Sequence, residues 1–191
     1  MTRVPDATLS LPIRGLNLTG ATLAAEVDSF PGEFTLLAFL RHYGCMFGRE
    51  MVRDIRAATK TIAGFPTPLF VGLGDADETT EYMKPTWPEA PVICDPDRVL
   101  FNAFELGRGS VMQMFGPSVW ACHLRASFKG NFFGRFVGDP WIMPGVFVVD
   151  RARTIRYKHD FRHHGDHPNW SKIPSMITPK VDHPPIAAVL A

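Results

Sequence analysis

Cys45 lies at the junction of two hydrophobic patterns, in a place where a thiol can be made reactive. Residues 34–40 are nearly all apolar, which is typical of a strand buried on both faces. After Cys45, apolar residues recur at helical spacing over residues 46–63. The two patterns predict that Cys45 lies just past the end of a central strand, at the N-terminus of a helix. Unpaired N–H groups and the helix dipole favour anions there, and cysteines in such places often have lowered pKa values and act as nucleophiles.

Three basic residues, Arg41, His42 and Arg49, lie close to Cys45 in the sequence and would add positive potential around it. Arg49 also has another interpretation, as half of a solvated helix pair with its neighbour Glu50. One turn after Cys45, it can equally face the same pocket. The alternative for Cys45 itself is a buried, inert thiol, because free cysteine is among the most buried residue types. That alternative is favoured for Cys94 and Cys122.

The composition bounds the class of protein. The chain has 191 residues, of which 46% are hydrophobic and 20% charged, and this suits one globular domain with a full core. The net charge is +1 and no block of Lys and Arg occurs, so neither nucleic acid nor an anionic membrane is a favoured partner. Three cysteines do not form a disulfide framework, and no signal peptide or membrane-spanning stretch is visible. We therefore expect a cytoplasmic protein.

The order of the predicted elements indicates the fold class. They are strand 34–40, helix 46–63, strand 69–73, helix 75–84, strand 91–94, helix 97–106, a helix near 118–126 and a hairpin over 146–158. Parallel βαβ units followed by a hairpin predict an α/β fold, with a central mixed sheet and helices on both faces. Active residues in such sheets lie at the carboxyl ends of strands, where Cys45 is expected.

A cluster of four histidines begins the C-terminal tail. It comprises His159, His163, His164 and His167, with Asp160 and Asp166 between them. These residue types bind Zn, Cu or Ni, but their spacing matches no established metal signature. We therefore predict that the tail is a solvated polar loop without a metal site. No Gly-rich nucleotide-binding motif occurs in the sequence, so no cofactor is expected. The tail would join the site if it folded back over Cys45.

Three segments in this order resemble the peroxiredoxin-like branch of the alkyl hydroperoxide reductase/thiol-specific antioxidant superfamily. Residues 41–50, RHYGCMFGRE, are similar to its R-x-x-G-C-x-x-C-R-E signature. Residues 138–150 resemble its later strand motif, and residues 157–168 resemble its C-terminal stretch. The resemblance spans about residues 30–170. It implies a single thioredoxin-like domain over 1–191, with a core of about 30–160, an N-terminal extension and a His- and Pro-rich tail.

The chain departs from that signature at two positions. Gly48 replaces the second cysteine of the C-x-x-C, and His42 replaces the threonine usual three residues before the active cysteine. The resemblance therefore implies one-thiol chemistry. Cys45 would attack a peroxide and become a sulfenic acid, which an external thiol, Cys94 or Cys122 would reduce. His42 and Arg49 would be the electrostatic helpers in catalysis.

The resemblance also implies a substrate pocket around Cys45. Its expected residues are Tyr43, Gly44, Met46 and Gly48 from the motif, and Met143 and Pro144 from the later strand motif. The thioredoxin fold places a cis-proline facing the active cysteine, so we expect a cis bond between Met143 and Pro144. Because related folds often dimerise, a homodimer is a further expectation.

Two other functions stay open. The chain could be a degenerate thioredoxin-fold protein that binds or transforms a small apolar ligand without thiol redox cycling. It could also be a metal-dependent enzyme that combines the histidine-rich tail with His42 or Cys45. The aromatic and basic run at 128–136 fits base stacking, an apolar ligand site or packing under a loop.

Overall fold

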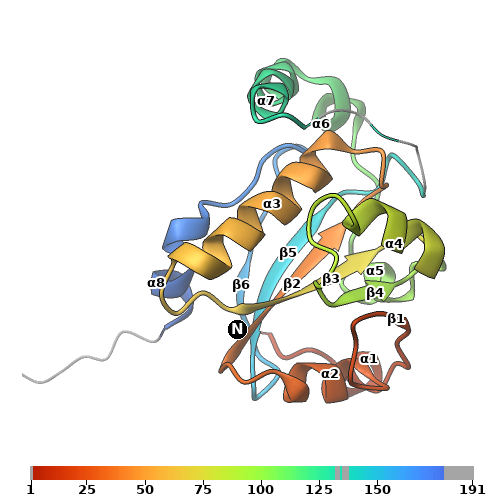
Figure 1. Ribbon diagram of the computed structural model, residues 1–191, viewed down its shortest axis with the longest axis vertical. Helices are drawn as coiled ribbons and strands as arrows, with labels where there is room; N and C mark the ends of the chain where they lie inside the picture. The colour runs from red at the N-terminus through yellow and green to blue at the C-terminus, as the bar shows by residue number, and fades with distance from the viewer. Residues whose placement is uncertain (1, 132–133, 135–137, 179–191) are drawn as a thin grey trace, which may run out of the picture.

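Six strands form one mixed sheet in the order β1-β4-β3-β2-β5-β6 (Figure 1). The computed structural model describes residues 2–131, 134 and 138–178, so part of the run 128–136 lies outside the described residues. The strands are β1 (Gly15–Leu16), β2 (Phe34–Leu40), β3 (Thr67–Gly72), β4 (Val92–Cys94), β5 (Gly145–Asp150) and β6 (Ile155–Lys158). Strands β2, β3 and β4 are parallel, whereas the β5–β6 hairpin joins β2 in antiparallel fashion. The predicted mixed sheet and hairpin are confirmed.

Helices cover both faces of this sheet. They are α1 (Asp6–Leu9), α2 (Leu23–Ser29), α3 (Met46–Thr61), α4 (Ala76–Met83), α5 (Val99–Ala103), α6 (Val111–Phe115), α7 (Pro117–Phe128), the 3-10 helix η1 (Trp170–Lys172) and α8 (Ile173–Ile177). Alternate residues of β2 point to opposite faces. Leu36 packs with residues of α3, α4 and α8, whereas Leu37 packs with α1, α2 and α5. The central strand is therefore buried on both sides, as its composition predicted.

The junction between β2 and α3 places Cys45 where the pattern predicted. Strand β2 ends at Leu40, and Cys45 is the residue that caps α3. The first helical hydrogen bond runs from the Arg49 N–H to the Cys45 carbonyl at 3.3 Å. In Figure 1, α6 and α7 lie beyond the sheet, next to this N-terminal end of α3. Cys45 therefore lies between the end of the sheet and the α6–α7 pair.

The helix predicted over residues 97–106 is shorter than expected, because the backbone turns at both of its ends. Arg98 and Glu105 have positive φ values of 59° and 57° and interrupt the helical path. The Asp95 carboxylate accepts the free N–H groups of residues 99–101 at 2.8 to 3.0 Å. This side-chain cap fixes α5 at Val99–Ala103.

The expected cis bond between Met143 and Pro144 is not found, since none of the described peptide bonds is cis. Pairing of β5 with β2 begins at Gly145, opposite Phe39, so Pro144 stands just outside the ladder. Its missing N–H is not needed there, and the intrinsically favoured trans bond opens the strand. None of the helices in the described part of the chain has the length and apolar character of a membrane span.

Candidate functional site

A cavity of about 540 Å³ lies at the N-terminal end of α3. Its described polar lining residues are Arg41, His42, Cys45, His123, Ser127 and His164. Its apolar lining residues are Met46, Phe47, Met114, Phe115, Val119, Trp120, Pro140 and Trp141. The first turn of α3, the α6–α7 pair and the segments around Pro140 and His164 thus enclose one space. It has polar groups beside the thiol and apolar walls elsewhere.

Cys45 belongs to the wall of this cavity and is otherwise enclosed by protein. Only 3% of the residue is exposed, and it packs with Phe47 of α3 and with Val119 and Cys122 of α7. The three cysteines of the chain are free thiols. A molecule in the cavity therefore reaches Cys45 in an environment from which most water is excluded.

Arg41 carries the positive charge next to Cys45. Its side chain donates a hydrogen bond from Nη2 to the Pro140 carbonyl. Among the described residues, Nε and Nη1 have no hydrogen-bond partner, although Arg41 is only 5% exposed. Burial lowers the pKa of Arg41, while the charges of Cys45 and Asp139 act in the opposite direction. Arg41 is therefore a buried cation in the cavity wall, with one hydrogen bond to the backbone and two donors without a partner among the described residues.

The histidines of the cavity are neutral at physiological pH. Burial and the charge of Arg41 lower the pKa of His42 from 6.5 to about 3 and that of His164 to about 4. Burial also lowers the pKa of His123. His164 donates from Nδ1 to the Gln113 carbonyl at 2.9 Å, which leaves Nε2 as a hydrogen-bond acceptor. Any contribution of His42 must therefore come from hydrogen bonding and not from charge.

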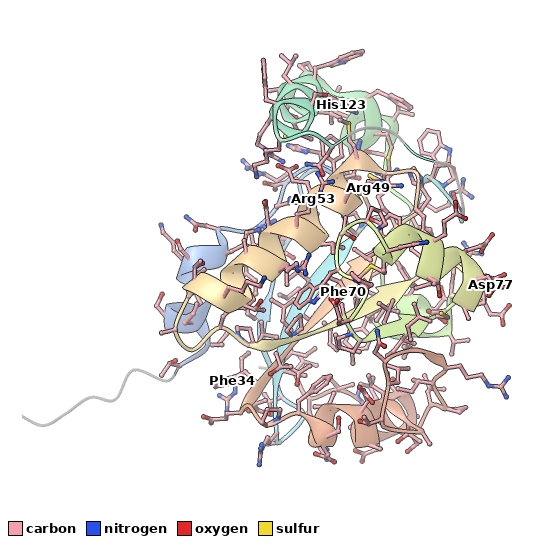
Figure 2. All side chains as sticks on the ribbon, in the orientation of Figure 1. Phe34, Arg49, Arg53, Phe70, Asp77 and His123 are labelled. Carbon is pink, nitrogen blue, oxygen red and sulfur yellow. The ribbon has the colours of Figure 1, made fainter. Side chains whose placement is uncertain are left out.

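Arg49 lies one turn along α3, outside the set of described residues that line the cavity. Its guanidinium stands 5.0 Å from the ring centre of Tyr82, whose ring stacks on Tyr43 at 4.4 Å. Both Cys45 and Arg49 act electrostatically on Tyr82. Figure 2 shows Arg49 and Arg53 on successive turns of α3, with His123 beyond them on α7. Tyr82 therefore links Arg49 to the thiol without bringing Arg49 into the cavity.

Gly48 occupies the position of the second cysteine in the C-x-x-C motif, and there is no room there for a side chain. A Cβ atom at this position would lie 2.9 Å from Tyr82 Oη and 3.9 Å from Cys45 Cβ. Tyr82 is buried and stacked, so its hydroxyl cannot easily withdraw. The packing around Gly48 therefore suits a glycine and leaves no space for the second cysteine of the motif.

The other predicted pocket residues take different places. Met46 lines the cavity, whereas Tyr43, Gly44, Gly48, Met143 and Pro144 are not among the described lining residues. Tyr43 turns toward α4, where its hydroxyl lies 2.7 Å from Thr79 Oγ1. Gly44 accepts a hydrogen bond from the Gly134 N–H at 3.1 Å, and Met143 donates one to the Gly107 carbonyl at 3.0 Å.

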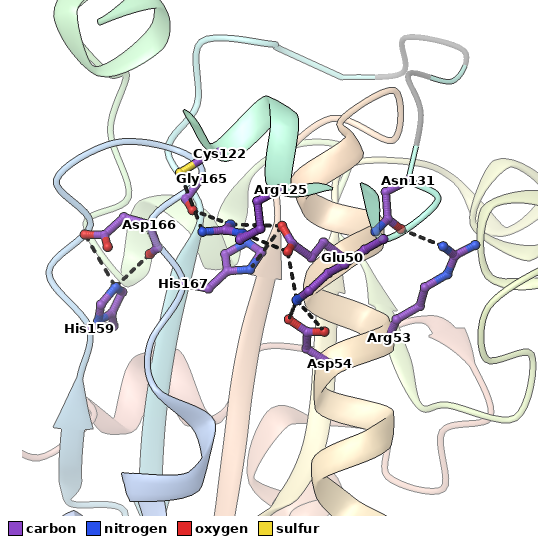
Figure 3. A network of polar contacts seen from close by, with 11 residues as sticks. Glu50, Arg53, Asp54, Cys122, Arg125, Asn131, His159, Gly165, Asp166 and His167 are labelled. Carbon is purple, nitrogen blue, oxygen red and sulfur yellow. Dashed lines mark hydrogen bonds and ion pairs between the residues drawn. The ribbon is translucent and has the colours of Figure 1, made fainter. Parts of the chain in front are cut away.

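The histidine-rich tail is not the solvated loop that its composition predicted. His163 and His164 are buried, and the side chain of His167 is only 6% exposed. Arg125 of α7 fixes the tail by donating to the Gly165 carbonyl at 2.9 Å (Figure 3). The tail folds back over the first turns of α3, and His164 thereby joins the cavity wall. Composition alone could not reveal the α7 surface that covers these rings.

Glu50, which is itself buried, forms the centre of a charge network with Arg125, Lys129 and Asp54 (Figure 3). Its carboxylate accepts from Arg125 at 2.9 and 3.0 Å and lies 3.0 Å from Lys129 Nζ. The described residues Glu50, Asp54 and His167 come within reach of a shared metal ion. However, Lys129 already supplies the cation between the two carboxylates, 2.9 Å from Asp54. The interpretation of Glu50 as a solvated partner of Arg49 is therefore wrong, since the residue is 1% exposed.

Most of the cavity walls were not foreseen from the sequence. Phe115, Trp120 and His123 come from residues 107–140, where the periodicity is weak, whereas Trp141 belongs to the later strand motif at 138–150. Arg41 was recognised as a source of positive potential and not as a lining residue. The position of Arg41, two residues before the turn into α3, was the signal from which its place in the cavity wall could have been predicted.

Comparison with known proteins identifies the family. The sequence profile described as AhpC/TSA antioxidant enzyme matches residues 54–163, more than half of the chain. This chain belongs to the AhpC/TSA family. The match begins after Cys45, so it includes the α6–α7 walls of the cavity but not Arg41, His42 or Cys45. Peroxiredoxin-like 2C of Mus musculus is 22% identical over 197 residues, which cover 92% of this chain and 87% of the relative.

Two solved structures share the fold of this chain. The bacterioferritin comigratory protein of Xanthomonas campestris has a TM-score of 0.55 at 15% identity, covering 91% of this chain and 94% of its own. Peroxidoxin BcpB of Mycobacterium tuberculosis has a TM-score of 0.50 at 12% identity, covering 79% and 82%. The AhpC/TSA family member described here is thus a peroxiredoxin-like protein with a thioredoxin fold, as its motifs indicated.

Proposed function

We propose that this AhpC/TSA family member is a thiol-dependent peroxidase that reduces organic hydroperoxides, with Cys45 as its nucleophile. The observation that carries the proposal is the position of the Cys45 thiol. Cys45 is the N-cap residue of a long helix just past the end of a central strand, and it lines a cavity whose wall also includes Arg41. A helix N-terminus and a neighbouring cation both favour a thiolate.

In the proposed reaction, the Cys45 thiolate attacks the terminal oxygen of a hydroperoxide. An S–O bond forms, the O–O bond breaks, and the alkoxide takes up a proton and leaves as an alcohol. Cys45 is thereby oxidised to a sulfenic acid. An external thiol then forms a mixed disulfide with Cys45 and releases water, and a second thiol restores Cys45 and leaves as a disulfide. Gly48 offers no local partner, so the reductant comes from outside the motif.

Arg41 is the group best suited to stabilise the transition state. The positive charge of its guanidinium can stabilise the negative charge that develops on the leaving alkoxide. His164 would contribute through its neutral ring, since Nε2 is available as an acceptor for the hydroperoxide proton. Arg49 would act indirectly, by holding Tyr82 against the first turn of α3.

The size and walls of the cavity favour an organic hydroperoxide as the substrate. A volume of about 540 Å³ lies within the range of small-molecule sites and far exceeds the needs of hydrogen peroxide. The walls away from Cys45 are formed by Phe115, Trp120, Trp141 and other apolar side chains. These walls would bind an apolar group and hold its hydroperoxide end beside the thiol.

The same cavity supports a second candidate function, the binding or transformation of a small apolar ligand without redox cycling. The missing C-x-x-C partner and the neutral histidines favour it. In that case the alcohol product of a hydroperoxide would bind as a ligand, and the thiol would stay reduced.

Stopped-flow kinetics with cumene hydroperoxide and hydrogen peroxide separate the two functions. We expect a fast oxidation with cumene hydroperoxide, at a rate constant roughly tenfold or more above that for hydrogen peroxide because of its apolar group. Cys45→Ser removes this phase, whereas Cys94→Ser and Cys122→Ser, as matched thiol controls, retain it. A phase that survives in Cys45→Ser contradicts the proposal. Tight binding of cumyl alcohol without any thiol oxidation supports the second function.

A further inference from the structure

The turn at residues 138–141 joins the charged part of the cavity wall to its apolar part. Pro140 and Trp141 both line the cavity, and the Pro140 carbonyl accepts the hydrogen bond from Arg41 Nη2. The other two nitrogens of the guanidinium have no hydrogen-bond partner among the described residues. The direction of the Pro140 carbonyl therefore decides where the guanidinium is held relative to Cys45.

The side chain of Asp139 closes this turn. Its Oδ1 atom accepts a hydrogen bond from the Trp141 N–H at 2.9 Å, and its backbone carbonyl accepts one from the Ile142 N–H at 3.3 Å. An aspartate that accepts from the N–H two residues further on forms an Asx turn, which fixes the peptide groups between them. The residue between them is Pro140, so Asp139 fixes the direction of the Pro140 carbonyl.

The main chain on both sides of the turn is held by other parts of the fold. Gly138 has a φ of 89°, which favours glycine, and a Cβ atom there would lie 2.8 Å from Leu73 Cβ. On the other side, the Trp141 carbonyl accepts a hydrogen bond from the Gly109 N–H at 2.8 Å. Because both ends of the turn are fixed in this way, the Asp139 side chain controls the peptide groups between them and not the position of the whole segment.

The charge of Asp139 contributes less to this turn than its hydrogen bond does. Its Oδ2 atom lies 3.3 Å from Arg108 Nη1 and 3.6 Å from Arg98 Nη1. These arginine side chains are 61% and 44% exposed, and ion pairs with exposed partners contribute little to stability. Asparagine would keep the Oδ1 acceptor and remove the charge. The two contributions of Asp139 can therefore be separated by substitution.

We propose that Asp139 is a positioning residue, which aims the Pro140 carbonyl at Arg41 and thereby holds the guanidinium beside the reactive thiol. The same hydrogen bond fixes the backbone of Trp141, whose ring forms part of the apolar wall. One side chain thus sets the cation and the apolar wall relative to each other. The benefit to peroxide reduction rests on the proposed function, whereas the position of the cation beside Cys45 does not.

Alkylation of Cys45 tests the proposal without any peroxide. Iodoacetate is an anion and iodoacetamide is neutral, and both react with the thiolate. The ratio of their rate constants therefore reports the positive potential at Cys45 and is independent of the thiolate fraction. The measurement uses the full chain in a Cys94→Ser/Cys122→Ser background, in which Cys45 is the one remaining thiol.

Asp139→Ala is expected to lower the ratio of iodoacetate to iodoacetamide rate constants by about threefold or more, because the cation is no longer held beside the thiol. Arg41→Met should lower the ratio at least as far, and Asp139→Ala should then have no further effect in the Arg41→Met background. Asp139→Asn keeps the turn and should retain the ratio of the parent chain. Asp97→Ala, which removes an exposed carboxylate from the loop before α5, is the matched control and should also retain it.

Three results would overturn the proposal. One is an unchanged or raised ratio in Asp139→Ala, which is the result if the carboxylate acts only as a negative charge near the thiol. Another is a fall in Asp139→Asn as large as that in Asp139→Ala, and this isosteric variant decides the question even if Asp139→Ala does not fold. The third is an unchanged ratio in Arg41→Met. Failure of the proposed function would appear separately, as a wild-type Cys45 that cumene hydroperoxide does not oxidise.

Discussion

Replacing Glu50 by glutamine removes a buried negative charge where α3, α7 and the C-terminal tail meet. The wild-type carboxylate is 1% exposed and accepts two hydrogen bonds from Arg125 and one from Lys129. A glutamine keeps the shape of the side chain and one acceptor oxygen. The substitution therefore isolates the charge from the packing.

The expected loss of stability follows from the exposure of the partners. Breaking a fully buried ion pair costs about 3–5 kcal/mol, because it leaves an uncompensated charge. Here Arg125 and Lys129 are 41% and 45% exposed, and Lys129 retains Asp54. Water compensates part of the loss, so we expect Glu50→Gln to lower the free energy of unfolding by about 2–3 kcal/mol. For a chain of this size that corresponds to a melting temperature about 4–12 °C lower.

Urea denaturation at neutral pH measures this difference, with Asp54→Asn as the matched control. Asp54 pairs with the half-exposed Lys129 at the rim of the network, so its loss is expected to be under about 1 kcal/mol. Burial opposes ionisation of Glu50, but hydrogen bonds from Arg125 and Lys129 hold its pKa below 4.5. A lowered carboxyl pKa stabilises the fold above pH 4.5, and this contribution is lost as the pH falls through the folded-state pKa. The gap between wild type and Glu50→Gln therefore narrows in acid; equal losses in both variants, or a constant gap, would refute the reasoning.

Three more predictions follow from the site. Burial lowers the pKa of His167 from 6.5 to about 4, so its contribution to stability is present above pH 6.5 and is lost as the pH falls toward 4. Urea titrations at several pH values should show this decline in the free energy of unfolding. His167→Gln should make the free energy of unfolding less dependent on pH over this range. Gly48→Cys is expected to lower the free energy of unfolding by about 1–3 kcal/mol through the clash with Tyr82. Tyr82→Phe in the same background should restore part of this loss. An undiminished melting temperature for Gly48→Cys would argue against the clash. Arg41→Met is expected to lower kcat/KM for cumene hydroperoxide by about 10²- to 10³-fold. The melting temperature should not fall, because the guanidinium is buried with two donors that have no partner among the described residues. Unchanged kinetics would remove Arg41 from the mechanism.

The parts of the fold that depend on local patterns were predictable from the sequence. The apolar run 34–40 and the helical spacing after Cys45 predicted β2 and α3, and the alternation around residues 146–158 predicted the closing hairpin. The structure differs where hydrophobic spacing does not report how the backbone turns or is capped. The carboxylate of Asp95 and two positive-φ residues shorten α5, and the trans bond before Pro144 follows from the start of the β5 ladder at Gly145.

The site was predictable only at its centre. Cys45 and Met46 follow from the pattern around the strand end, but the cavity walls come from segments far apart in the chain. The burial of Glu50 depends on Arg125, which is 75 residues away. Likewise, the histidine-rich tail looks solvated until α7 covers it. Spacing in the sequence carries no information about such partners, so a polar composition was mistaken for exposure.

Mass spectrometry of sulfenic acid tests the central claim most directly. The reduced chain is treated with one equivalent of cumene hydroperoxide in the presence of dimedone, which traps sulfenic acids, and the adduct is located by peptide mapping. Our account predicts one adduct, on Cys45, and none in Cys45→Ser. An unmodified Cys45, or an adduct on Cys94 or Cys122 instead, would contradict it.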